Sequence, residues 1–285
     1  MSLNSVNTNM GAMIALQSLN RTNTQLAATQ KQISTGYRVA DATDDGAAYA
    51  VAQSVRSTVG ALTSANQQLG TVQGLLSTTE SSLNDVSNTM ASMRDVLVKL
   101  SDSDVSGTQR PQYQSQYNSL LANVKTFIQD AGYNGKTLIG NITGSSGSFA
   151  RVATVRNESG SSYGIATFGG SALFNAISFS FGGATYGSAA GIATLLGTAG
   201  AFITQMTSVG NGLSTVGSEV NYVSNQISYN SDKVDALNTG LGSLVDADLA
   251  KESAALQALQ IRQQLGTQAL SMANQAPQTL LSLFK

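Results

Sequence analysis

Side chains able to perform acid–base, nucleophilic or metal chemistry are scarce in this sequence. The 285 residues include no His and no Cys. Their absence removes the commonest general base, the commonest metal ligand and every thiolate nucleophile. The His-Glu-x-x-His pattern of zinc peptidases therefore cannot occur. The sequence predicts no enzyme activity, no catalytic or metal-binding residue and no cofactor.

A few short motifs could still carry chemistry, and each has a simpler explanation. Asp44, Asp45 and Gly46 resemble half of a calcium loop, but no Glu follows at the spacing that would complete it. A solvated turn and helix start explain this cluster better. Asn141 and Asn157 begin N-glycosylation sequons, a pattern that is common by chance. The Gly-rich stretches lack the Lys-Ser/Thr of a phosphate-binding loop.

The composition points instead to a protein that associates with itself. Charged residues make up 11% of the chain, against about 25% in ordinary soluble domains. The net charge of -1 predicts no general attraction to nucleic acid or anionic lipid. A surface of Ser, Thr, Asn, Gln and Gly is polar but easily desolvated, which suits burial against other copies of the chain.

No membrane segment or Sec signal peptide is expected. We find no continuous apolar run of about 20 residues. The opening residues lack both a basic region and a continuous apolar region. If the protein leaves the cell, we expect a different export route.

Two stretches carry apolar residues at steps of three and four, the pattern of a coiled-coil seam. Each predicts a rod about 60 Å long at about 1.5 Å per residue. Because one rod runs outward and the other returns, we expect an antiparallel pair. The first seam comprises Leu62, Ala65, Leu69, Val72, Leu76, Thr79, Leu83, Val86, Met90, Met93, Leu97 and Leu100. The second comprises Met206, Val209, Leu213, Val216, Val220, Val223, Ile227, Asn230, Val234, Leu237, Leu241 and Leu244. Asn230 in such a seam usually fixes register.

The segment between the rods should contain a third helix and a small β region. Pro111 suits a first helical turn, and an apolar face follows as far as Ile128. The turn 132–135 contains Asn-Gly and should end this helix. From about 136 to 200 the chain is rich in Gly and Ser. Alternating stretches at 149–156 and 176–181 predict one or two β-hairpins there.

The two chain ends share a character that suggests mutual packing. Residues 1–40 and 253–285 contain no Asp or Glu, and each end has the spaced apolar residues of a weak amphipathic helix. Such helices cannot bury themselves well alone, so we expect further burial against neighbouring copies. The candidate self-assembly residues are Met13, Leu16, Leu19, Leu26, Ile33, Leu256, Leu259, Leu265, Leu270 and Pro277.

Several stretches resemble a known family. They are Ser5–Asn9, Ile33–Val39 with Ala42–Ala48, Thr79–Asn84, Tyr133–Leu138, Asp246–Asp248 and Ala273–Leu283. All are similar to signatures of bacterial flagellins, and the last matches closely. The resemblance covers about 1–140 and 200–285, and it is to short, alphaproteobacterial-type flagellins without large outer domains.

The resemblance implies a mainly α fold and a structural role. It implies an inner domain of paired terminal helices at 1–45 and 246–285, and a helical rod domain at 46–245 with an outer, hairpin-rich region at about 136–200. It also implies self-assembly into the extracellular flagellar filament for swimming motility, after type III export. The implied partners are the chain itself, the export apparatus and a chaperone, the cap, and hook-associated junction proteins, with no nucleic acid and no membrane span.

Two alternatives from other classes remain open. A hook–filament junction protein shares the helical ends and would differ in copy number. A soluble coiled-coil signalling or adaptor protein would remain in the cytoplasm and would not polymerise. The ending Asn274–Gln278 favours flagellin over the junction protein.

Overall fold

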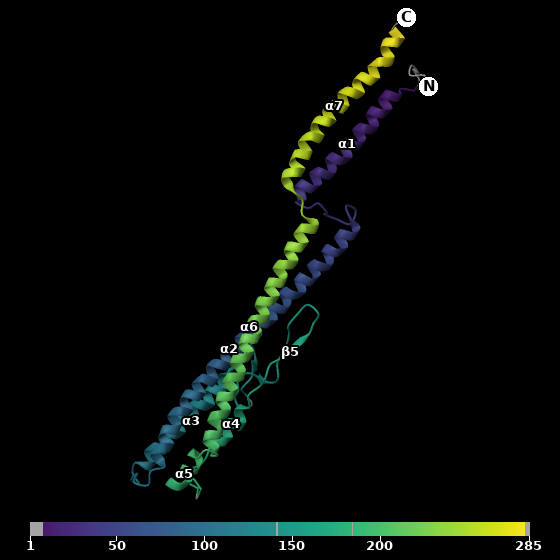
Figure 1. The fold of residues 1–285 in the computed structure, drawn as a ribbon. Coiled ribbons are helices and arrows are strands. Elements are labelled where there is room, and N and C mark those ends of the chain that lie inside the picture. Colours follow the sequence, from purple (N-terminus) through teal and green to yellow (C-terminus); the bar gives the residue numbers. More distant parts are fainter. Residues whose placement is uncertain (1–7, 141, 184, 283–285) are drawn as a thin grey trace. The chain divides into compact units, whose positions relative to one another are not determined.

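The computed structural model describes residues 8–140, 142–183 and 185–282, and from 276 onward the backbone alone. The chain divides into two compact units. We call residues 1–58 with 235–285 the terminal unit and residues 59–234 the central unit. Two long helices, α2 (Gly46–Leu100) and α6 (Ala201–Val245), contribute to both units. The mainly α, long-helix fold expected from the sequence is confirmed (Figure 1).

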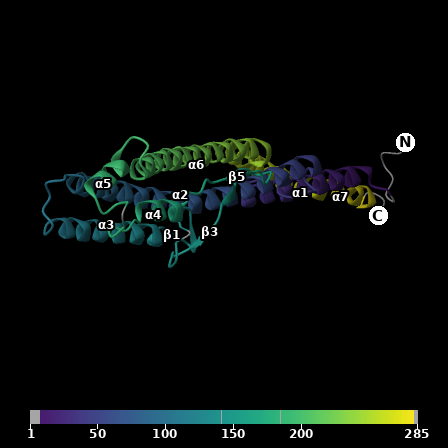
Figure 2. The same ribbon diagram turned by 90° about the horizontal axis from the view of Figure 1, so that it is seen from below.

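Two antiparallel helices from opposite ends of the chain dominate the terminal unit. Figures 1 and 2 show α1 (Met10–Thr35) and α7 (Leu249–Ser282) side by side. Asn9 Nδ2 donates to Ala273 O at 2.6 Å, and Gln263 Nε2 donates to Asn23 Oδ1 at 2.8 Å. The Asn9 side chain also caps α1 by accepting from Ala12 N. The expected pairing of the two chain ends is therefore present.

The central unit is built on α2, α6 and a third helix, α3 (Arg110–Asp130). Pro111 lies in the first turn of α3, as the sequence predicts. Within this unit, the colours of Figure 1 show α2 and α6 running in opposite directions, which confirms the antiparallel pair. Tyr117 of α3 is fully buried, and its hydroxyl donates to Ile177 O at 2.7 Å.

Two small β elements lie beside these helices. In the first, β2 (Lys136–Thr137) pairs with β1 (Gly132–Tyr133) antiparallel and with β3 (Ser148–Phe149) parallel. Asn134 and Gly135 join β1 to β2 with φ of 48° and 72°. Both values are positive, as a two-residue type I′ hairpin turn requires. The predicted Asn-Gly turn is confirmed.

The second element is a hairpin of β4 (Ala153–Val155) and β5 (Ser162–Gly164), with Thr154 opposite Tyr163. Its loop is closed by Asn157, whose Oδ1 accepts from Ser161 N at 3.0 Å. The strand expected near 149–156 is therefore present, although it is divided between β3 and β4. We call residues 152–166, which contain this hairpin, the hairpin segment.

The prediction of a strand at 176–181 is wrong. Residues 170–177 form the helix α4 (Gly170–Ile177), and a further helix, α5 (Ala189–Leu196), follows. Leu173 and Ile177, four residues apart, share the buried face of α4. Phe179 and Phe181 then pack against the Tyr117 ring from irregular backbone, with ring centres 5.1 and 5.3 Å away. Aromatic packing therefore produces the alternation that resembles a strand.

One segment of the described chain, Ala189–Val245, is long and apolar enough to cross a membrane by length and composition alone. One such helix is weak evidence for a membrane span, and 17% of its most apolar stretch is buried in the described structure. The regular helix is interrupted between α5 and α6, at 197–200. Ile192, Leu195 and Phe202 are buried in the core of the central unit, which accounts for their apolar character.

Candidate functional site

The α1–α7 pair exposes many of its apolar side chains. Among the predicted assembly residues, Met13, Leu16 and Leu265 are 62%, 47% and 59% exposed. A further group of exposed apolar side chains lies on the same two helices: Met10, Ile14, Ile261 and Met272. This amount of exposed apolar surface on one helix pair is typical of an interaction site.

The other predicted assembly residues lie deeper between the two helices. Leu259 is buried. Leu19 lies over Gly266, where a β-carbon would stand 3.3 Å from Leu19 Cδ1. The side chain of Pro277 lies outside the described residues. The remaining members are half-buried: Leu26, Ile33, Leu256 and Leu270.

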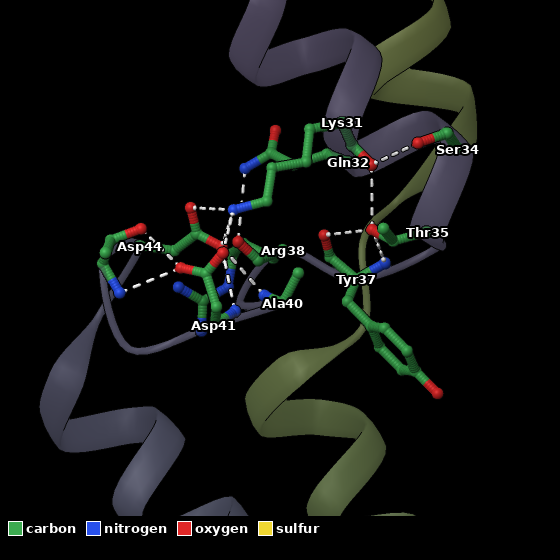
Figure 3. Close-up of polar contacts among 10 residues, drawn as sticks. Lys31, Gln32, Ser34, Thr35, Tyr37, Arg38, Ala40, Asp41 and Asp44 are labelled. Atoms are coloured by element: carbon green, nitrogen blue, oxygen red, sulfur yellow. Dashed lines mark hydrogen bonds and ion pairs between the residues drawn. The ribbon is translucent and has the colours of Figure 1, made fainter.

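A polar cluster holds the chain where α1 turns toward α2 (Figure 3). Lys31 Nζ lies 2.6 Å from Asp41 Oδ2 and 2.8 Å from Asp44 Oδ1. The second oxygen of Asp44 accepts from the backbone N–H groups of Ala40 and Asp41. Hydrogen bonds from Lys31 hold the pKa of both carboxyl groups below the ordinary value, and the two carboxylates raise the pKa of Lys31.

The same cluster explains the acidic motif of the sequence. Asp45 Oδ1 accepts from the N–H groups of Ala47 and Ala48 at 3.1 and 3.0 Å, so Asp45 caps the start of α2. Asp44 is satisfied by Lys31 and backbone. The expected turn and helix start are confirmed.

Backbone hydrogen bonds join this crossover to the chain that leaves α6. Arg38 N and Val39 N donate to Val245 O at 2.8 and 3.3 Å, and Ala247 N donates to Gly36 O at 2.9 Å. Arg38 Nη2 also donates to Leu244 O. The connection from α1 to α2 and the connection from α6 to α7 are therefore hydrogen-bonded to each other.

The seam of the long helices is unequally buried on its two sides. The predicted α2 residues are buried almost completely: Leu69, Leu76, Leu83, Met90 and Leu97. The predicted α6 residues are half-buried: Leu213, Val220, Ile227, Val234 and Leu241. Other members of the predicted α6 seam are buried. Val209, Val216, Val223 and Asn230 follow the buried Phe202 at seven-residue spacing.

Asn230 occupies a seam position, as the sequence predicts, and has three hydrogen-bond partners. Its Nδ2 donates to Asn66 Oδ1 at 2.9 Å and to Arg156 O at 3.0 Å, and its Oδ1 accepts from Gln226 Nε2. Asn66 lies on α2, whereas Arg156 belongs to the loop of the β4–β5 hairpin. A single amide therefore joins three elements of the central unit.

Glu219 is a functional candidate that the sequence analysis did not identify. It is 7% exposed on α6, and its Oε1 accepts from Ala166 N at 2.8 Å. Its Oε2 has no hydrogen-bond partner in the described part of the chain. Burial raises the pKa of this carboxyl group. One sequence signal could have found it, since Glu219 is the sole charged residue in 159–231.

Further contacts hold the hairpin segment along α6. The rings of Tyr163 and Tyr222 stack with centres 4.1 Å apart, and Lys233 forms an ion pair with Glu158 at 2.5 Å. Glu219, Tyr222, Asn230 and Lys233 thus form a polar strip on α6. The α6 helix of the central unit therefore packs its apolar seam against α2 and binds the hairpin segment through this polar strip.

Comparisons with known proteins agree with this architecture. Residues 6–143 match the family described as bacterial flagellin N-terminal helical region, and 196–284 match bacterial flagellin C-terminal helical region. The chain is 33% identical to flagellin FljK of Caulobacter vibrioides, over 100% of both chains. It is 32% identical to a flagellin of Brucella melitensis, over 99% of both.

A solved structure shows the same fold. A Vibrio parahaemolyticus protein described as a flagellar hook-associated protein aligns with a TM-score of 0.58 at 15% identity, covering 71% of this chain and 100% of that one. From the paired terminal helices, the long antiparallel seam and these full-length matches, we conclude that the chain belongs to the bacterial flagellin family.

Proposed function

We propose that copies of this chain assemble through the apolar side chains that α1 and α7 leave exposed. The chain is a structural subunit of the flagellar filament, which lies outside the cell and serves motility. The observation that supports our assignment of the assembly surface is the exposure of Met13, Leu16 and Leu265 on a paired helix surface. Removing such side chains from water is the main driving force of protein association.

The scarcity of charge supports the same surface. On the described parts of α1 and α7, Arg21 and Arg262 are the only charges between residues 10 and 30 and between 253 and 275. Burying polar but uncharged side chains needs far less desolvation energy than burying ions. Many copies can therefore pack these helices together without leaving carboxylates unpaired.

We further propose the domain division expected from the family resemblance. Residues 1–45 and 246–285 form an inner domain, and 46–245 form the rod domain. The predicted seam residues on α2 and α6 hold this rod together. Export by the flagellar apparatus with a chaperone, and growth beneath a cap next to hook-associated proteins, complete the proposal.

A test is electron microscopy of the purified protein after seeding with filament fragments. We expect filaments to elongate from the seeds in a concentration-dependent manner. Protein that stays monomeric under seeding would contradict the assembly proposal. Copy number per cell separates a filament subunit, made in thousands, from a junction protein, made in a few copies.

A further inference from the structure

The central unit carries an open pocket between α2 and the two β elements. Its volume is about 190 Å³, larger than the ~150 Å³ cavity known to admit benzene. Its walls are apolar where Val72, Leu75 and Val152 line it. The side chains with polar groups around it are Gln68, Thr71, Tyr133, Asn134, Lys136 and Thr154. The pocket is therefore suited to an aromatic ring with a polar end.

A buried polar atom in this pocket lacks a partner. Thr154 is 3% exposed, and its Oγ1 has no hydrogen-bond partner among the described residues. A buried hydroxyl without a partner is costly, so a ligand that supplies a donor or acceptor there gains free energy. Lys136, at the same pocket, is exposed and forms no ion pair in the described chain.

The complementary feature lies on α6. Tyr229 is 60% exposed, the highest value among the large hydrophobic side chains described in the central unit. Asp232, one helical turn further along, is exposed and also forms no ion pair with a described residue. Residues three apart share a helix face. This face therefore presents an aromatic ring with a hydroxyl tip beside a negative charge.

The pocket and Tyr229 lie at nearly the same position along the paired helices α2 and α6. The hydrogen bond from Asn230 to Asn66 sets residue 230 of α6 level with residue 66 of α2. Tyr229 is adjacent to Asn230, and the pocket begins at Gln68. A contact between them would therefore join two copies side by side rather than end to end.

We propose that Tyr229 of one copy inserts into this pocket of a neighbouring copy, with Asp232 meeting the neighbour's Lys136. The proposal rests on the proposed function and names a lateral contact within the filament. The Tyr229 ring packs against Val72, Leu75 and Val152, which are already nearly buried, and a shift of the pocket wall brings its hydroxyl to the enclosed Thr154 Oγ1. The Asp232–Lys136 pair orients the partners. Because Tyr229 and the pocket are different surfaces, the contact is heterologous and can repeat from copy to copy, as a helical polymer requires.

The first test is polymerisation of Tyr229→Ala and Tyr229→Phe beside the wild-type chain. Tyr229→Ala should raise the critical concentration about tenfold or more, since buried tyrosines are frequent interface anchors. Tyr229→Phe keeps the ring and should lose less. Circular dichroism of each monomer should match the wild type, because the side chain is exposed. An unchanged critical concentration for Tyr229→Ala would overturn the proposal.

The second test reverses charge. Lys136→Asp and Asp232→Lys should each raise the critical concentration, and the double variant in one chain should recover most of the loss because neighbours again carry opposite charges. Double-variant values equal to the sum of the two losses would refute the pairing.

The third test uses the absence of Cys from the chain. Lys136→Cys with Asp232→Cys should cross-link neighbouring copies through a short bis-maleimide in filaments but not in dilute monomer. Asp95→Cys with Asp232→Cys is the control, because Asp95 is exposed on α2 far from the pocket. Filaments that form but do not cross-link at 136 and 232 would end this proposal and leave the proposed function intact. A wild-type chain that never polymerises would overturn the function itself.

Discussion

At the scale of single residues, Asn230 shows how one buried amide specifies a helix pair. Its hydrogen bonds to Asn66 and to Arg156 O are satisfied in one register of α2, α6 and the hairpin. A slip of either helix would leave these groups buried and unpaired, at about 1–3 kcal/mol each. Apolar neighbours in the seam do not discriminate in this way, because their contacts are non-directional.

We therefore expect Asn230→Ala to lower the free energy of unfolding by about 1–3 kcal/mol, because Asn66 Oδ1 loses this donor and Arg156 O keeps only the bond from Gln226 Nε2. Urea unfolding followed by circular dichroism measures this. Asn225→Ala on the same helix is the control, since Asn225 is exposed, and it should change stability by less than about 0.5 kcal/mol. Equal effects of the two variants would contradict a special role for Asn230.

Glu219 should make stability depend on pH in the direction opposite to most carboxylates. Burial raises its pKa above the ordinary 4.5, although the N–H of Ala166 and the charge of Arg151 oppose the shift. The favourable contribution is thus complete below about pH 4.5 and is lost as pH rises through the folded pKa. Glu219→Gln keeps an acceptor for Ala166 N but removes the charge.

We expect Glu219→Gln to stabilise the protein near neutral pH and to lose that advantage near pH 4. Urea unfolding at both pH values decides this. Glu158→Gln serves as the opposite control. The hydrogen bond from Lys233 lowers the pKa of Glu158, so its contribution is present above the ordinary pKa and disappears on acidification. A Glu219→Gln variant less stable than wild type at neutral pH would contradict the argument.

At the scale of elements, α4 depends on close approach to the chain that follows α3. Gly170 is buried at the start of α4, and a β-carbon there would stand 2.1 Å from Ile139 O and 2.6 Å from Ile128 Cγ2. Neither the carbonyl nor the buried Ile128 can move aside freely. Gly170 therefore lets α4 begin directly against Ile139 and Ile128.

Gly170→Ala should therefore destabilise the protein by about 1–3 kcal/mol through overpacking. Gly210→Ala in α6 is the matched control. A β-carbon at Gly210 meets nothing within 4 Å, so the helix should gain about 0.5–1 kcal/mol from the substitution. Urea unfolding of both variants gives the comparison. If both substitutions changed the free energy of unfolding in the same direction, α4 would not need the close approach at Gly170.

The crossover after α1 should also be sensitive to acid. Lys31 lowers the pKa of Asp41 and Asp44, so their stabilising contribution is present above about pH 3.8 and is lost as pH falls through the lowered values. Lys31→Gln should be less stable than wild type at neutral pH, and the difference should vanish in strong acid. Lys251→Gln, at an exposed residue of α7, is the control. A difference independent of pH would exclude the ion pairs as its cause.

At the scale of the whole molecule, stability and assembly should be separable. Leu16 is half-exposed in the single chain, so a charge there costs the monomer little. In the proposed assembly the same side chain is buried by neighbours, where an unpaired carboxylate costs several kcal/mol. That penalty recurs at every subunit along the filament.

Leu16→Asp should consequently fold but fail to elongate seeds, whereas Leu16→Met should elongate them normally. Sedimentation with and without seeds measures assembly, and circular dichroism measures folding. Normal elongation by Leu16→Asp would remove α1 from the assembly surface.

The sequence alone determined those features of the fold that depend on regular spacing between nearby residues. The seams of α2 and α6, the Pro111 start of α3 and the Asn134-Gly135 turn were all predictable, because each depends on side chains a few residues apart. The pairing of acid-free chain ends was predictable for a related reason, since both helices lack a way to bury themselves alone.

The tertiary structure decided what depends on partners distant in the chain. Residues 176–181 alternate like a strand, yet Leu173 and Ile177 form a helix face because α3 and Ile139 offer a surface for it. Asn230 was a plausible register residue from its position, but Arg156 O as its partner was not foreseeable. Glu219 is held by Ala166, 53 residues away. Hydrogen bonds across such separations leave no periodic signal in the sequence, because they follow from how the elements pack together.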